Sequence, residues 1–157
     1  MNKTSRFSDD EVAGFIRRLL GEQRLAVLST VHSNGHPYVT LVAFAWTPDL
    51  KCLAFATPRA TRKFEHMQSN PQVALLVDNR TGRQEDFHEA MALTALGEAR
   101  ESSGNERGRL LDSYRERHSA LADFVQSPST ALMVVDVERY ILVRQFQNVL
   151  ELRMAPQ

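Results

Sequence analysis

The stretch from Cys52 to Val77 constrains the fold more than any other part of the sequence. It contains an apolar strand, a short helical segment that begins at Thr61-Arg62-Lys63, and a second apolar strand after Asn70-Pro71. The asparagine-proline pair ends the helix, because proline has no N–H for the helical hydrogen-bond pattern. Phe64 and Met67 lie three residues apart, so the helix has an apolar face that anchors it against a core.

Short strands follow one another along the rest of the chain. Before them, a helix over Asp9–Leu20 begins with the capping-box pair Ser8 and Glu11 and carries apolar residues at helical spacing. Asn34-Gly35 then marks a tight hairpin. The predicted strands are Arg24–Val31, Tyr38–Trp46, Leu53–Ala56, Gln72–Asp78, Ala90–Arg100, and one or two within Ala131–Leu152. The fifth of these is rich in alanine, so a helix remains an alternative there.

The chain of 157 residues has the length of one domain. A broken helical stretch precedes the last strands. Short antiparallel strands at close intervals, with few helices, favour a small barrel with appended helices over a doubly wound parallel sheet. We therefore expect one mostly β domain with a helix at 9–20, a barrel at 24–100, a helical segment at 105–126 and C-terminal strands at 131–152.

Composition excludes several classes of protein. Lysine plus arginine number 19 and aspartate plus glutamate number 19, so no overall field attracts nucleic acid or an acidic membrane. No run approaches the roughly 20 apolar residues that cross a bilayer, and the first residues lack the apolar core of a signal peptide. The single cysteine, Cys52, cannot form an intrachain disulfide and fits a reducing compartment. We expect a cytoplasmic protein without nucleic-acid or membrane partners.

The helix start at residues 61–63 combines one hydroxyl with two cations. The first N–H groups of a helix have no intrahelical partner, and the helix start carries partial positive charge. A bound anion accepts hydrogen bonds from these N–H groups and balances that charge. Arg62 can grip two phosphate oxygens, Lys63 adds a point charge, and the Thr61 hydroxyl adds a hydrogen bond. A solvated surface cap uses the same residue types, so that alternative stays open.

The order of these signals resembles the FMN-binding split barrel of the pyridoxamine 5'-phosphate oxidase superfamily. In that family a strand ending in threonine precedes a Ser/Thr-Arg-Lys helix start that holds the phosphate of FMN, and Asn-Pro and an apolar strand follow. Here Thr57, Thr61-Arg62-Lys63 and Asn70–Leu76 have the same order. The resemblance implies an antiparallel split β-barrel with FMN bound noncovalently by Thr57, Thr61, Arg62 and Lys63. It places Val42 and Phe44 beside the flavin ring, as lining residues or as plain core. It also implies a homodimer with flavin at the interface.

Departures from the family pattern bear on the reaction. The oxidases carry an arginine and a lysine where Leu41 and Trp46 stand here, and a glutamine near Ala92. Their C-terminal motif for the substrate phosphate has no counterpart among these residues, so oxidation of vitamin B6 is not expected. The segment Val137–Leu150 is similar to a strand of haem-utilisation relatives, although their glycines are replaced here.

The remaining candidate residues leave three functions open. The histidines lack the paired spacing of a zinc site, so no metal is expected. His32 and His36 flank the Asn34-Gly35 turn, where they serve solvation or haem ligation. No general acid or base is identified, and the catalytic residues stay unknown. The open functions are an FMN-dependent oxidoreductase acting on a small molecule, a haem-binding protein, and a protein that binds flavin or deazaflavin without turnover.

Overall fold

The computed structural model describes residues 6–156. The helices are α1 (Asp9–Glu22), α2 (Arg62–Ser69), α3 (Asp86–Glu89), α4 (Gly104–Arg117), the 3-10 helix η1 (Ser119–Leu121) and α5 (Ala122–Gln126). The strands are β1 (Leu25–Val31), β2 (Pro37–Trp46), β3 (Cys52–Pro58), β4 (Gln72–Asp78), β5 (Met91–Glu101), β6 (Thr130–Arg144) and β7 (Asn148–Arg153). Within the described range, none of the helices has the length and apolar character needed to span a membrane.

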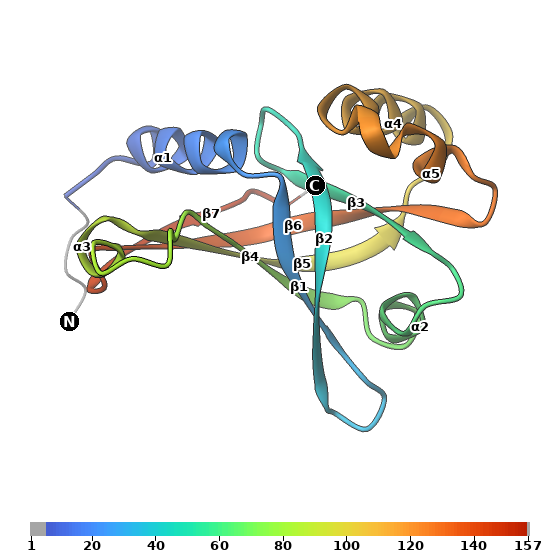
Figure 1. Cartoon of the computed structure of the whole chain (residues 1–157), viewed down its shortest axis with the longest axis horizontal. Coiled ribbons are helices and arrows are strands. Elements are labelled where there is room, and N and C mark those ends of the chain that lie inside the picture. Colours follow the sequence, from blue (N-terminus) through green and yellow to red (C-terminus); the bar gives the residue numbers. More distant parts are fainter. Residues whose placement is uncertain (1–5, 157) are drawn as a thin grey trace.

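Six strands of this described part form a closed antiparallel barrel (Figure 1). Neighbours pair in the order β3-β2-β1-β4-β5-β6, and β6 pairs back with β3 to close the ring. Strand β7 continues the sheet beyond β6. The expected fold class, a mostly β antiparallel barrel with flanking helices, is confirmed. The strand predicted over Ala90–Arg100 is β5, so the helix alternative for that stretch is wrong.

Strand β6 is 15 residues long and pairs with three neighbours. Its first half lies between β5 and β3, and its second half lies between β5 and β7. The expected barrel range, 24–100, therefore lacks the strand that closes the ring. The pairing of β6 with β5 shifts its register at Gly97, where an added Cβ would lie 2.1 Å from the carbonyl oxygen of Asp136. Only glycine lets the two backbones approach this closely.

Alternation along the strands fills the barrel with apolar side chains. This interior includes Leu28, Val42, Phe44, Leu53, Phe55, Leu75, Leu93, Met133, Val135 and Tyr140. The buried face of α1 joins the same core. The predicted capping box is present, since the Ser8 hydroxyl accepts from the N–H of Glu11 at 3.3 Å and the Glu11 carboxylate accepts from the N–H of Ser8 at 2.8 Å. The predicted first helix is thereby confirmed.

A second apolar cluster lies outside the barrel, under α4 and α5. Its members are Ala45, Cys52, Ala54, Ala56, Leu110, Tyr114, Val125, Leu132 and Val134. The two helices flank β3 and the start of β6 in Figure 1. The predicted helical segment is therefore present, and its apolar residues cover the outer face of the sheet.

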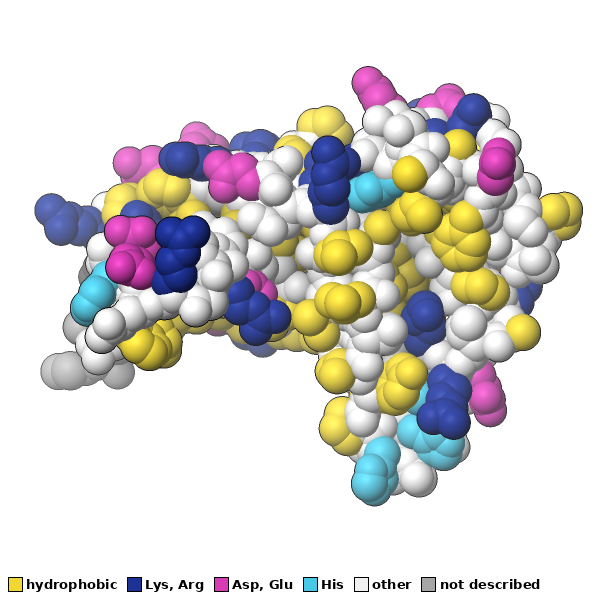
Figure 2. All heavy atoms as spheres, in the orientation of Figure 1, with side chains coloured by type: hydrophobic (Ala, Val, Ile, Leu, Met, Phe, Trp, Pro, Cys, Tyr) yellow, Lys and Arg dark blue, Asp and Glu magenta, His cyan; other side chains and the backbone are white. Residues whose placement is uncertain are grey.

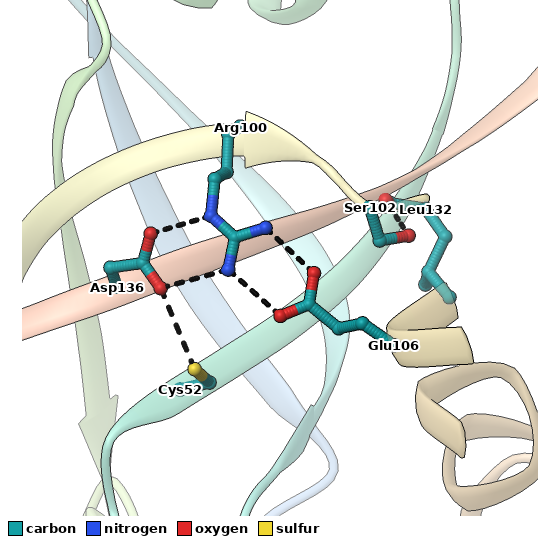
Figure 3. Close-up of polar contacts among 6 residues, drawn as sticks. All are labelled: Cys52, Arg100, Ser102, Glu106, Leu132 and Asp136. Atoms are coloured by element: carbon teal, nitrogen blue, oxygen red, sulfur yellow. Dashed lines mark hydrogen bonds and ion pairs between the residues drawn. The ribbon is translucent and has the colours of Figure 1, made fainter. Parts of the chain in front are cut away.

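A polar network joins β5, β6 and α4 beside this cluster (Figure 3). The guanidinium of Arg100 donates to Asp136 at 2.6 Å and to Glu106 at 2.6 Å. These hydrogen bonds raise the pKa of Arg100 and lower that of Glu106. The thiol of Cys52, which is buried, lies 3.6 Å from Asp136 Oδ1. The network ties α4 to the barrel.

Candidate functional site

The candidate site lies where β3 passes into α2. Thr57 is buried, and its hydroxyl oxygen lies 2.9 Å from that of Thr61. Thr61 caps the helix, because its Oγ1 accepts from the N–H of Phe64 at 3.4 Å and donates to the carbonyl of Pro58 at 2.9 Å. A hydroxyl has one proton to donate, and the Thr61 hydroxyl donates it to the carbonyl oxygen of Pro58. The two threonines therefore fix the turn, and in this geometry Thr61 positions the helix start instead of donating to a ligand.

Arg62 and Lys63 occupy the first turn of α2. Arg62 is exposed, and Lys63 is partly buried. Within residues 6–156, neither side chain takes part in an ion pair or a side-chain hydrogen bond. Burial lowers the pKa of the Lys63 ammonium, because removal from water disfavours its charged form. Two uncompensated cations beside N–H groups of a helix start fit a phosphate dianion.

Helix α2 is anchored by side chains of its first two turns. Met67 is buried in the barrel core and Phe64 packs against that core, as predicted. His66 is only 5% exposed, and its Nδ1 lies 2.9 Å from the hydroxyl oxygen of Thr30 in β1. The rings of His32 and Tyr38 contact the His66 ring edge to face, at centroid distances of 5.2 and 5.5 Å. These contacts hold α2 against the β1–β2 hairpin.

A cavity of about 450 Å³ lies between that hairpin and α2, and we call it the hairpin pocket. Its lining residues are His32, Asn34, His36, Pro37, Tyr38, Arg62, Glu65 and His66. Figure 2 shows histidine and cationic side chains gathered at this end of the molecule. The sequence identified the two hairpin histidines as candidate site residues, but it did not identify Tyr38, Glu65 or His66. One signal was available for His66, since it follows Arg62 by four residues and so lies on the same helical face.

The side chains of Val42 and Phe44 lie in the barrel core. Phe44 is fully buried, its ring lies 5.2 Å from the guanidinium of Arg117, and its carbonyl oxygen lies 2.7 Å from Nε2 of His118. Alternation along β2 directs both side chains inward and leaves Leu41 on the outside. The structure thus brings Thr57, Thr61, Arg62 and Lys63 together. The predicted contact of Val42 and Phe44 with a flavin stays a prediction. Because both side chains lie inside the barrel, a flavin ring on the outer face of β2 would contact their backbone atoms.

In the part of the chain that the structure describes, no three histidine, cysteine, aspartate or glutamate side chains converge in a way that could hold a metal ion. The histidines of the hairpin pocket are therefore arranged as separate polar groups around a cavity.

Comparison with known proteins places the chain in a family. The sequence pattern that describes the pyridoxamine 5'-phosphate oxidase family matches residues 9–144. The chain belongs to this family. Its fold is the split barrel expected from the sequence. Among curated proteins, none is a match to the sequence.

Solved structures show the same fold in proteins described as binding different ligands. A heme binding protein from Mycobacterium smegmatis has a TM-score of 0.82 at 14% identity over 96% of this chain, which spans 60% of that protein. The heme storage protein HutZ from Vibrio cholerae has a TM-score of 0.68 at 19% identity, covering 80% of this chain and 89% of that one. An FAD-binding protein from Mesorhizobium loti has a TM-score of 0.64 at 18% identity, covering 80% of this chain and 89% of that one. At these identities the likeness establishes the fold alone.

Proposed function

We propose that the chain binds FMN noncovalently at the start of α2 and acts as a flavin-dependent oxidoreductase on a small molecule. The observation that carries this proposal is the pair Arg62 and Lys63, whose charges have no counterion within residues 6–156, at a helix start fixed by Thr57 and Thr61. A phosphate placed there accepts hydrogen bonds from the first-turn N–H groups and from both cations. Membership of the oxidase family and the FAD-binding structural relative support a flavin as the bearer of that phosphate.

The chemistry of this proposal is divided between cofactor and protein. A bound flavin supplies hydride or electron transfer. The chain's own residues bind the phosphate and orient the ring along the outer face of β2. Leu41 and Trp46 stand where the oxidases carry cations, which disfavours the phosphate-bearing substrate of those enzymes. The substrate we propose is therefore a small molecule other than a vitamin B6 phosphate.

A second copy of the chain completes the proposed site. Leu25, Val39 and Leu41 lie on the outward face of β1 and β2 and are 54%, 62% and 63% exposed. Figure 2 shows hydrophobic side chains exposed along β1 and β2. Because burial of adjacent apolar side chains favours association, we propose that two barrels meet along this face with the flavin between them. The lone cysteine supports a reducing compartment such as the cytoplasm.

Haem is the second candidate ligand. The hairpin pocket is lined by three histidines, and imidazole is a common axial ligand of haem iron. Two of the structural relatives are described as haem-binding or haem-storing proteins. A haem protein would show a Soret band, and single replacements of His32, His36 and His66 would identify the axial ligand as the histidine whose loss removes that band. A flavoprotein would instead show the flavin absorption bands.

Titration with FMN and with riboflavin tests the proposed function. Riboflavin has the same ring but no phosphate, so we expect it to bind roughly 100-fold or more weakly, since two charge-assisted hydrogen bonds are worth about 1.5–3 kcal/mol each. FMN at saturation should also raise the melting temperature, as any ligand of the folded state does. A phosphate-bearing deazaflavin in the same assay distinguishes the two ring systems. Equal affinity for FMN and riboflavin would contradict the proposal.

A further inference from the structure

We propose that the hairpin pocket is a second anion site, which adjoins the cofactor's phosphate site at Arg62 and binds the carboxylate or phosphate group of a small molecule. The pocket is built from the β1–β2 hairpin and α2, and its polar side chains come from both. The inference goes beyond the proposed function, because binding in this pocket requires no bound cofactor.

Hydrogen-bond donors line the pocket on both sides. The N–H of Asn34 donates to Nδ1 of His32 at 3.1 Å, so in the neutral ring the proton is on Nε2, which is then the donor. The Tyr38 hydroxyl adds a donor from the same hairpin. From α2 comes the guanidinium of Arg62, a planar fork that matches the geometry of a carboxylate or phosphate.

Hydrogen-bond donors, and not a net charge, favour an anion in this lining. Its titratable and charged groups are Arg62, Glu65, Tyr38 and the three histidines. The Glu65 carboxylate balances the charge of the Arg62 guanidinium, so the anion is held by directed N–H and O–H groups.

The pocket adjoins the cofactor site but has its own lining. Arg62 belongs to both sites, whereas Lys63 and the Thr57–Thr61 pair do not line the pocket. The volume of about 450 Å³ is within the range of roughly 300–1,000 Å³ found for small-molecule sites. One wall is fixed, because His66 is buried and contacts Thr30 in β1. A compact organic acid or phosphate ester fits this combination of size and hydrogen-bond donors.

Imidazole NMR signals provide a direct test. Inorganic phosphate and, separately, acetate are titrated into the protein at one fixed pH, with and without saturating FMN. We expect saturable shifts of the His32 and His36 signals, and the anion with the lower dissociation constant identifies the preferred group. In the double variant H32Q/H36Q, in which the imidazole signal of His66 reports binding, anion affinity should fall about tenfold or more, as expected for the loss of charge-assisted hydrogen bonds. FMN affinity should change less than about twofold. The exposed His88, in α3, supplies the control variant H88Q, which should bind anions as the unmodified protein does.

The outcomes separate this inference from the proposed function. If FMN does not bind but phosphate still shifts the hairpin signals, the pocket stands and the cofactor proposal fails. If FMN competes with phosphate for the hairpin signals, the pocket is part of the cofactor site and the inference is wrong. It is also wrong if neither anion shifts those signals, or if H32Q/H36Q binds anions as tightly as H88Q.

Discussion

The Nδ1 atom of His66 in α2 lies 2.9 Å from the hydroxyl oxygen of Thr30 in β1, and both residues are buried. This contact spans 36 positions of sequence and joins the proposed phosphate-binding helix to the barrel wall. Because the helix is only eight residues long, its orientation depends on such contacts more than on its own hydrogen bonds. The position of Arg62 and Lys63 therefore depends on residues remote from the site.

Replacing Thr30 with valine tests this anchor. The change keeps the shape but leaves His66 without its buried hydrogen-bond partner, so the free energy of unfolding should fall by about 1–3 kcal/mol in urea denaturation. Thr40→Val on β2, at a partly exposed position, is the control and should change it by less than about 0.5 kcal/mol. Equal stability of the two variants would show that the contact contributes nothing.

Gly97→Ala tests the close approach of β5 to β6. An alanine Cβ would overlap the backbone carbonyl of Asp136, which cannot move without breaking the ladder. We expect a loss of about 2–4 kcal/mol in the free energy of unfolding. Gly108 lies within α4 with nothing within 4 Å of an added Cβ. Gly108→Ala should therefore stabilise by about 0.5–1 kcal/mol. A neutral effect at Gly97 would mean that the two strands separate more easily than their pairing indicates.

The stability of the fold should decrease at acidic pH through His118. Burial lowers the pKa of its imidazole, and the positive charges of Arg117 and Arg24 lower it further, against a hydrogen bond to the Phe44 carbonyl that raises it. The native state then binds this proton less readily than the unfolded state, so the free energy of unfolding falls as the pH drops below the ordinary histidine value of about 6.5. In His118→Gln the dependence on pH should be weaker, while His88→Gln should keep it. Denaturant curves between pH 5 and 8 measure both, and parallel curves for the two variants would argue against a role for His118.

Leu41→Asp tests the proposed dimer. The side chain is 63% exposed in one chain, so the substitution does not disturb the barrel core, but a carboxylate there would have to be buried in the dimer. Light scattering after gel filtration should show a shift from dimer to monomer. Val149→Asp, at a 58% exposed position on β7, should leave the mass unchanged. A monomeric unmodified protein would refute the dimer outright.

Local patterns in the sequence were sufficient for most of the elements. The Asn34-Gly35 pair does form the predicted hairpin turn, with Gly35 at a φ of +88° that suits glycine. The apolar run after Asn70-Pro71 predicted β4 over Gln72–Asp78, and the capping box predicted the start of α1. The closure of β6 onto β3 could not be predicted in this way, because pairing between distant strands depends on the whole sheet and leaves no local pattern.

The candidate site was predictable to a similar degree. The run Thr61-Arg62-Lys63 is a local signal for an anion site at a helix start. The neighbours that shape the site are not local: Thr30 reaches His66 only through the pairing of β1 with β4 and the packing of α2 on that sheet. For Val42 and Phe44, alternation alone predicts that both side chains lie on one face of β2. It does not predict whether that face lines the core or the outside of the barrel.

The dissociation constant of FMN for the double variant R62A/K63A tests the central claim most directly. Quenching of flavin fluorescence measures it, and the control variant R83A/R153A removes the same charge from two exposed positions elsewhere. We predict that R62A/K63A raises the dissociation constant by about 100-fold or more, because two charge-assisted contacts to the phosphate are lost. The control should bind FMN as the unmodified protein does. Equal dissociation constants for the two double variants would contradict the claim that this helix start holds the phosphate.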